Sequence, residues 1–376
     1  MEFKYMSELL VAEDKELLIS IGIVAHNEAD CIGKMLSSLF KQSLLNQTIS
    51  RLHIELIVLP NGCTDDTAEV AHQTLNSLVD PSTNKSIHWK VREIEQPGKP
   101  NAWNLFVHKF SRPNAQYFFL MDSDIQFLDE NTLYSMLQTI LSSSDAWVVV
   151  DKPIKDVSLK PNKTLRESLS SVISGLSGGK ATEGGPAWLC GQLYCAKSDV
   201  LKQISFPTGL MNDDSFLYTM IVTENLKTKQ NPNRVILAKS ASHVFEAYTE
   251  ISHLLRHERW LIAGSAVNEL VFNRLRELDK VGQTAGEYIL KNNDSYPQWL
   301  SVLVQDEAKK RQWLIPRFIL IRRFIGLSNK PFYKKVILSP IALAAFIVDF
   351  ILSVQANQSL RQSSGLGYWG KHSQIL

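Results

Sequence analysis

The N-terminal half of the chain alternates continuous apolar runs with segments of helical spacing. Leu17–Ala25 (LLISIGIVA) is apolar at nearly every position and rich in β-branched residues, which is typical of a strand buried on both faces. Similar runs predict three more strands, His53–Leu59, Trp89–Ile94 and Tyr117–Met121. Helical spacing predicts helices over 32–40 and 101–110. This alternation predicts an α/β fold with a mostly parallel sheet flanked by helices.

The C-terminal half follows a looser pattern. From Gly175 to Gly191 the chain is rich in small residues, which favours a loop or lid against a ligand. Basic and apolar stretches dominate the end of the chain. We therefore expect an N-terminal extension over 1–16, an α/β domain over 17–262 and a helical, partly apolar extension over 263–376.

Polar clusters follow three of the predicted strands directly. They are His26-Asn27-Glu28, Asn61-Gly62 and Asp122-Ser123-Asp124. Ligands of open α/β sheets bind beyond the carboxyl ends of the strands, so we expect these clusters to lie at one nucleotide site.

The triplet Asp122-Ser123-Asp124 is a candidate metal site. Two carboxylates at a strand end suit Mn²⁺ or Mg²⁺, which take oxygen ligands and share substrate phosphates. A solvated acidic turn explains the triplet equally well when it is considered alone, but its position after a buried strand favours the metal.

Two further loops carry candidate binding residues. In the turn after the second strand, Asn-Gly gives a tight turn and Thr64 is the expected N-cap of the next helix, with Asp65 and Asp66 in its first turn. A role for these aspartates near a nucleotide base or ribose stays open. Before the 101–110 helix, Lys99 favours an anion such as a diphosphate, although a solvated lysine in a Pro/Gly loop is the alternative.

The pair Asp213-Asp214 is the candidate acid–base site. A carboxylate there could act as a general base that takes a proton from a substrate hydroxyl. The residues alone favour an acidic helix start, stabilised by the helix dipole. Among the histidines of this region, His243 is the best candidate metal ligand because it ends a predicted strand.

These segments, in this order, resemble the family 2 glycosyltransferases of the GT-A fold. The resemblance rests on VAHNE, NGCTDDT, GKPNAWN and LMDSD, and continues through LCGQLYCAKSDVL, Asp213-Asp214 and RHERW. Together they span 19–260. The last motif departs from the Q-x-x-R-W signature of processive members, because Arg256 stands where glutamine is common.

The resemblance implies a role for each matching residue. Asp214 would be the general base, and Asp124 would hold the metal. The residues expected to contact the donor or the acceptor are Asn27, Glu28, Asn61, Asp66, Lys99, Asn104, Asp122, Gly191, Gln192, Asp213, Arg259 and Trp260. The implied reaction is metal-dependent, inverting transfer from a nucleoside-diphosphate sugar to a carbohydrate or lipid-linked acceptor, in polysaccharide or glycolipid synthesis.

Two alternative functions are weighed against this one. A sugar nucleotidyltransferase or a dinucleotide oxidoreductase would carry a glycine-rich loop after the first strand, where His26-Asn27-Glu28 stands instead. A catalytically silent nucleotide-sugar-binding relative is the other alternative. Asp122, Asp124 and Asp214 argue against it because all three carboxylates are present.

Charge and cysteine content bound the location of the protein. The formal net charge is +2 and four cysteines form no C-x-x-C pair, so we expect no nucleic-acid partner and a cytoplasmic location. The apolar stretch Ile337–Val354 follows a basic segment that begins at Arg317. We interpret 317–354 as a peripheral contact with the cytoplasmic face of a membrane, through an interfacial or re-entrant helix. A single span and a buried helix are the alternatives.

Overall fold

The computed structural model describes residues 16–46, 51–79, 87–159, 181–247, 250–279, 282–328 and 330–362. All of the expected extension over 1–16 except Glu16, and the first six residues of the small-residue segment 175–191, lie outside the described residues. The chain divides into two compact units. The first comprises Met1–Phe206 and Phe216–Ala247, and the second comprises Pro207–Ser215 and Tyr248–Leu376.

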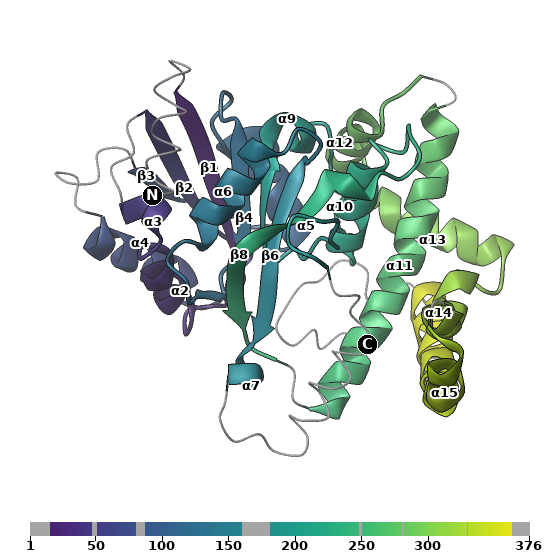
Figure 1. Ribbon diagram of the computed structural model, residues 1–376. Coiled ribbons are helices and arrows are strands. Elements are labelled where there is room, and N and C mark those ends of the chain that lie inside the picture. Colours follow the sequence, from purple (N-terminus) through teal and green to yellow (C-terminus); the bar gives the residue numbers. More distant parts are fainter. Residues whose placement is uncertain are drawn as a thin grey trace. The chain divides into compact units, whose positions relative to one another are not determined.

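The first unit is built on one twisted sheet, in which the described residues form eight strands (Figure 1). The strand order is β3-β2-β1-β4-β7-β6-β8-β5. The strands are β1 (Leu17–Ala25), β2 (Leu52–Pro60), β3 (Ile87–Val91), β4 (Tyr117–Asp122), β5 (Gln126–Phe127), β6 (Val148–Lys155), β7 (Leu193–Lys197) and β8 (Val235–Phe245). Pairing is parallel throughout β3-β2-β1-β4 and between β6 and β8, whereas β7 and β5 pair antiparallel. The predicted mostly parallel α/β sheet is confirmed.

Helices cover both faces of this sheet. Ile19, Ile21 and Ile23 of β1 belong to a core cluster with the apolar sides of four helices. These are α2 (Ile32–Leu39), α3 (Ser43–Asn46), α4 (Thr67–Leu78) and α6 (Thr132–Ser142). On the opposite face, α5 (Lys99–Leu105) continues into a single π-helical turn η1 (Phe106–Phe110). A β-carbon at Gly22 would lie 2.8 Å from the Phe106 ring, so glycine lets this helix pack directly on β1.

The first unit also contains two short helices near its strands β6 and β7. They are α7 (Asp156–Leu159) and α9 (Ser198–Leu201), and the 3₁₀ turn η2 (Pro232–Arg234) precedes β8. Helix α10 (Asp213–Val222) begins in the segment assigned to the second unit.

The second unit is helical. Its helices are α11 (Ile251–Asp279), α12 (Ala285–Ser295), α13 (Trp299–Lys310), α14 (Arg317–Ser328) and α15 (Phe332–Arg361). Helix α15 is long and apolar enough to cross a membrane, and only 22% of its most apolar window is buried. The expected helical, partly apolar C-terminal region is confirmed.

One predicted helix start is wrong. Helix α4 begins at Thr67 with Asp66 as its N-cap, because the Asp65 carboxylate takes the Thr67 N–H at 3.1 Å and Thr64 donates its own N–H to Asn27 instead. Helix α10 begins at Asp213, so the acid pair occupies its first turn, as the residues alone indicate.

Candidate functional site

Strand directions gather the predicted polar clusters at one edge of the sheet. Strands β1, β2, β4, β6 and β8 run in the same direction, so their carboxyl ends share an edge. Strand β7 runs the opposite way, which brings Gly191 and Gln192, before its first residue, to that edge. The Asp122 N–H accordingly donates to the Gln192 carbonyl at 3.0 Å. We call this the carboxyl edge.

The loop after β1 and the turn after β2 are tied together by hydrogen bonds. His26 Nδ1 lies 2.6 Å from the Asn61 carbonyl, and Asn27 Oδ1 accepts from the Thr64 N–H at 2.8 Å. Asn27 adopts a φ of 54°, a conformation that asparagine tolerates better than most residues. The Glu28 N–H donates to Thr67 Oγ1 at 2.8 Å. The predicted residues Asn27 and Glu28 therefore belong to a rigid framework.

Glu28 itself is buried, at 4% exposure, and its carboxylate accepts a hydrogen bond from the Cys31 thiol at 2.6 Å. Asp66 is exposed beside this framework, at the start of α4. Burial alone would raise the pKa of neighbouring Asp65, but hydrogen bonds from Thr67 and from the Ala29 N–H lower it. Asp65 is therefore charged, and its hydrogen bonds connect the loop after β1 with the turn after β2.

Asn61 is fully buried at the end of β2, yet neither its side-chain oxygen nor its side-chain nitrogen has a hydrogen-bond partner among the described residues. An unsatisfied buried amide costs about 1–3 kcal/mol. Gly62 follows with a φ of 60°, and a β-carbon there would lie 2.5 Å from that of Pro97. The turn therefore packs against the 96–98 loop, and the Asn61 amide can form hydrogen bonds with a bound ligand.

Lys99 joins three segments of the carboxyl edge. Its Nζ donates to Asp122 at 2.7 Å (Oδ1) and 3.1 Å (Oδ2), and it lies 3.5 Å from the Gly191 carbonyl. Both side chains are largely buried, so the pair is poorly screened by water. Lys99 therefore places a positive charge at the carboxyl edge, where the Asp122 carboxylate balances it.

Asp124 is half-buried in the turn after β4. The Ser123 hydroxyl beside it is buried without a hydrogen-bond partner among the described residues. From this turn the chain crosses to β5, whose Phe127 pairs with His243 of β8. The topology therefore carries Asp124 along the edge toward the end of β8.

His243 is fully buried, and its Nδ1 donates to Asp151 at 2.7 Å. Its Nε2 lies 3.3 Å from Gln192 Oε1. Asp151 stands where the pairing of β6 and β8 shifts register between Val150 and Lys152, and its second oxygen is buried without a hydrogen-bond partner in the described structure. A carboxylate behind a histidine fixes the position of the ring, so that Nε2 of His243 faces Gln192.

A divalent metal would find a partial set of ligands at this edge. Among the described residues, no three His, Cys, Asp or Glu side chains form a metal-holding group. Mg²⁺ and Mn²⁺ in phosphate-binding enzymes take one or two protein ligands, with water and substrate oxygens completing the shell. Asp124 and the Nε2 of His243 have the ligand chemistry of such a set, with an oxygen and an imidazole nitrogen as donors.

Asn104 is buried on α5, and both ends of its amide are engaged by one backbone unit. Nδ2 donates to the Phe206 carbonyl at 2.8 Å, and Oδ1 accepts from the Phe206 N–H at 2.9 Å. Contact with a donor would require Asn104 to exchange these partners.

The remaining predicted residues lie in the second unit. Asn212, before Asp213 and Asp214, accepts at its carbonyl from Asn268 at 2.8 Å and donates to Ser265 at 3.2 Å. A β-carbon at Gly264 would lie 2.7 Å from that of Asn212. Helix α11 thus fixes the start of α10 and the position of its acid pair.

Helix α11 also carries Arg259 and Trp260. Burial lowers the pKa of His257, although the charges of Glu258 and Asp214 raise it. The His257 ring stacks on Trp260 with centroids 6.1 Å apart. His257 therefore interacts with the charge of Asp214 and with the ring of Trp260, within the second unit.

Asp151 is the site-edge residue that the sequence analysis missed. It ends the apolar run WVVVD, so the strand-end rule applied to the first strands would have selected it. Asp151 lies outside the motifs on which the resemblance rests, so those motifs do not predict it.

The sheet order and the polar carboxyl edge define a GT-A type α/β fold. Residues 20–183 match the family model described as Glycosyl transferase family 2. This segment is less than half of the chain, and over it the chain is similar to the glycosyltransferase domains of that family. No curated protein matches the chain.

Solved structures with a similar backbone include three glycosyltransferases. A mannosyltransferase from Pyrobaculum calidifontis, in complex with GDP-Man and Mn²⁺, shares 15% identity over 94% of this chain and 93% of its own, with a TM-score of 0.49. Glucosyl-3-phosphoglycerate synthase from Mycobacterium tuberculosis shares 18% over 69% and 82%, with a TM-score of 0.46. S. aureus TarS 1–349 shares 17% over 92% of both chains, with a TM-score of 0.44. Likenesses this distant carry no argument about the chemistry of this chain.

Proposed function

We propose that this glycosyltransferase is metal-dependent and inverting, and moves a sugar from a nucleoside-diphosphate donor to a hydroxyl acceptor. The observation that carries the proposal is Lys99, which bridges Asp122 and the Gly191 carbonyl at the carboxyl edge. A fixed cation at a strand-end site suits the diphosphate of a donor.

The first two loops bind the nucleoside in this proposal. Asn61 supports this role because its buried amide has both a donor and an acceptor to offer. Asn27 and Glu28 shape the pocket, and exposed Asp66 contacts the base or ribose. Asp122, Asn104, Gly191 and Gln192 then line the path of the sugar, with Asp122 oriented by Lys99.

Asp124 and His243 are the proposed ligands of Mn²⁺ or Mg²⁺. When bound, the cation would stabilise the negative charge of the leaving diphosphate. Asp151 keeps the Nδ1 proton of His243 in place, so that Nε2 stays the available nitrogen. Lys99 supplies a second positive charge to the same leaving group.

Asp214 is the proposed base. It would take the proton from the acceptor hydroxyl as that oxygen attacks the anomeric carbon. Asp213, Arg259 and Trp260 are proposed to orient the acceptor, which we expect to be a carbohydrate or a lipid-linked sugar of polysaccharide or glycolipid synthesis. The described cysteines form no disulfide, which supports a cytoplasmic location, on the inner face of a membrane where lipid-linked acceptors are reached.

Release of nucleoside diphosphate from a panel of UDP- and GDP-sugars, with and without Mn²⁺, tests the proposal. Asp124→Ala and Asp214→Asn should each lower turnover at least about 100-fold, whereas exposed Glu130→Gln should not. Nucleotide binding should survive in Asp214→Asn, because the base does not hold the donor. Binding without any turnover in the unaltered chain would favour the catalytically silent relative, and release of pyrophosphate would favour a nucleotidyltransferase.

A further inference from the structure

Helix α15 leaves an apolar stripe uncovered by the described residues. Six of the exposed large apolar side chains of α15, each between 42 and 67% exposed, make up this stripe. They are Tyr333, Ile337, Ile341, Ile347, Val348 and Ile351. Their spacing of three, four or six to seven residues places them on one side of the helix. A stripe of this length is uncommon on a water-exposed helix.

Helix α14 carries a second apolar stripe. Phe318, Ile321, Phe324 and Ile325 are between 40 and 52% exposed, again at helical spacing. The two helices pack together, with the Phe324 and Phe346 ring centroids 5.4 Å apart. The hairpin α14–α15 is therefore one body that presents apolar side chains from both helices.

The charges of the hairpin are sorted between inside and outside. Asp349 is 1% exposed and accepts paired hydrogen bonds from both Arg322 and Arg323, at 2.7 to 3.2 Å. Arg322 also donates to Glu258 of α11 at 2.8 Å. These two arginines are thus neutralised by carboxylates. Four other basic residues of the hairpin, Arg317, Lys330, Lys334 and Lys335, form no ion pair with a carboxylate in the part of the chain that the structure describes, and they are exposed or half-exposed.

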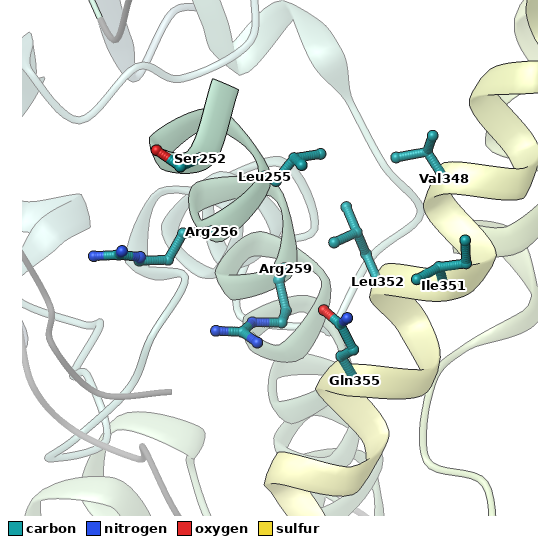
Figure 2. A pocket seen from close by; sticks show the side chains of 8 residues that line it. All are labelled: Ser252, Leu255, Arg256, Arg259, Val348, Ile351, Leu352 and Gln355. Carbon is teal, nitrogen blue, oxygen red and sulfur yellow. The ribbon is translucent and has the colours of Figure 1, made fainter. Parts of the chain in front are cut away.

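A pocket of about 460 Å³ lies between α11 and α15, and Figure 2 shows its lining. Leu255, Val348 and Leu352 face the gap, while the guanidinium groups of Arg256 and Arg259 point away from α15. Val348 and Ile351 line the pocket and also belong to the apolar stripe. The pocket therefore adjoins the apolar surface and is suited to a hydrocarbon chain.

We propose that the hairpin α14–α15 docks in the interface of a membrane that contains anionic lipid, with its apolar stripes in the acyl region and its free lysines on the headgroups. An amphipathic body with basic residues beside an apolar face is the form that lies in a bilayer surface. The buried ionic cluster on the other side of α15 opposes a full span, because charges within the hydrocarbon are costly. A second copy of the chain is disfavoured as the covering partner, since it would bring like cations together.

The inference goes beyond the proposed catalytic function and is measured by binding alone. The full chain is floated with vesicles of phosphatidylcholine, and with vesicles in which about a third of the lipid is phosphatidylglycerol. We expect strong binding to the anionic vesicles, weak binding to the neutral vesicles, and a loss of affinity as salt is raised.

Two variants separate the apolar and the electrostatic contributions. Ile337→Ser/Ile341→Ser/Ile347→Ser should abolish detectable binding, because each exposed isoleucine contributes about tenfold. Lys330→Gln/Lys334→Gln should weaken binding to anionic vesicles by about fivefold per lysine. The matched control Leu128→Ser/Leu159→Ser removes exposed apolar side chains from the first unit and should leave binding unchanged.

Three outcomes would overturn the proposal. Equal binding by the isoleucine variant and the control would show that the stripe does not contact lipid. Retention of the full chain in membranes after alkaline carbonate washing would indicate a spanning helix. Absence of vesicle binding, with a dimer by light scattering that the isoleucine variant abolishes, would assign the surface to a second copy of the chain.

Discussion

The contact between Asp151 and His243 shows how one buried carboxylate can decide what a neighbouring side chain is able to do. A histidine that donates from Nδ1 offers a lone pair at Nε2, and the choice is made by the group behind it. Loss of such a second-layer partner typically costs about 10–100-fold in metal affinity or activity.

Asp151→Asn should therefore lower kcat/KM by about 10–100-fold and raise the Mn²⁺ concentration needed for half-activity by a similar factor. The fold should survive, because the change removes a buried charge whose second oxygen has no partner in the described structure. Asp145→Asn alters an exposed aspartate just before β6 and should leave both values unchanged. Equal Mn²⁺ dependence in both variants would contradict the assigned role.

His108 makes a prediction about acid stability. Burial lowers its pKa below the ordinary 6.5, even though its hydrogen bond to the Ile204 carbonyl raises it. Below pH 6.5 the unfolded chain binds a proton that the folded chain resists, so the free energy of unfolding falls as pH falls toward the folded pKa. The slope contributed is at most about 1.4 kcal/mol per pH unit.

Urea unfolding between about pH 5 and 7.5 measures this slope. His108→Gln should reduce the pH dependence of the free energy of unfolding in that window. At the high end of the window the protonation of His108 does not contribute to this free energy in either protein. An unchanged difference between the two proteins at every pH would rule out His108 as the group responsible.

At the scale of the element, the apolar pattern predicts strands better than helix ends. The run Leu17–Ala25 is predicted and observed with the same bounds. A strand buried on both faces is apolar along nearly its whole length, so the ends of the apolar run mark the ends of the strand. The N-cap of α4 is Asp66 instead of the predicted Thr64, a shift of two residues, because three consecutive polar residues could each cap the helix. Only the partner across the turn, Asn27, decides that Thr64 is used elsewhere.

The site was predictable where it depends on strand direction and not where it depends on side-chain pairing. Parallel strands place Asn61 and Asp122 at one edge whatever their neighbours are. The Lys99–Asp122 pair, in contrast, joins residues that no local pattern connects, and the Asp151–His243 pair depends on a register shift between β6 and β8. Such contacts belong to the tertiary structure.

The turn after β2 depends on a glycine at position 62, and a substitution there tests the role of the turn. Gly62→Ala puts a β-carbon on a residue with a φ of 60° and within 2.5 Å of the Pro97 side chain. We expect a loss of about 2 kcal/mol or more in stability and roughly tenfold weaker nucleotide binding by calorimetry, since 1.4 kcal/mol of misplacement suffices.

Gly33→Ala is the matched control, because Gly33 lies inside α2 and its new β-carbon would meet Thr74 at an ordinary 3.4 Å. Alanine is favoured over glycine in a helix by about 1 kcal/mol, so this variant should be as stable as the original or more so. Similar losses in both variants would mean that the backbone of the Asn61–Gly62 turn is not the cause.

At the scale of the whole molecule, the two compact units have different sources of stability. The first depends on an apolar core shared between one sheet and its helices. The second places an ionic cluster among its helices, where Asp349 holds Arg322 and Arg323. Burial alone would raise the pKa of Asp349, but the two guanidinium groups keep it below the usual 3.8. The carboxylate is therefore charged at neutral pH and the arginines depend on it.

Removing one partner of a buried ion pair costs about 3 kcal/mol, because the remaining charge is left uncompensated. Asp349→Asn should consequently lower the melting temperature of the second unit by roughly 6–12 °C and leave the transition of the first unit in place. Differential scanning calorimetry of the full chain, with and without nucleotide to mark the first unit by its stabilisation, separates the two transitions.

Asp306→Asn is the control in the same unit, since its ion pair with Lys309 is half-exposed and contributes less than about 1 kcal/mol. If Asp349→Asn shifted both transitions together, the units would unfold as one body and their stabilities could not be assigned separately.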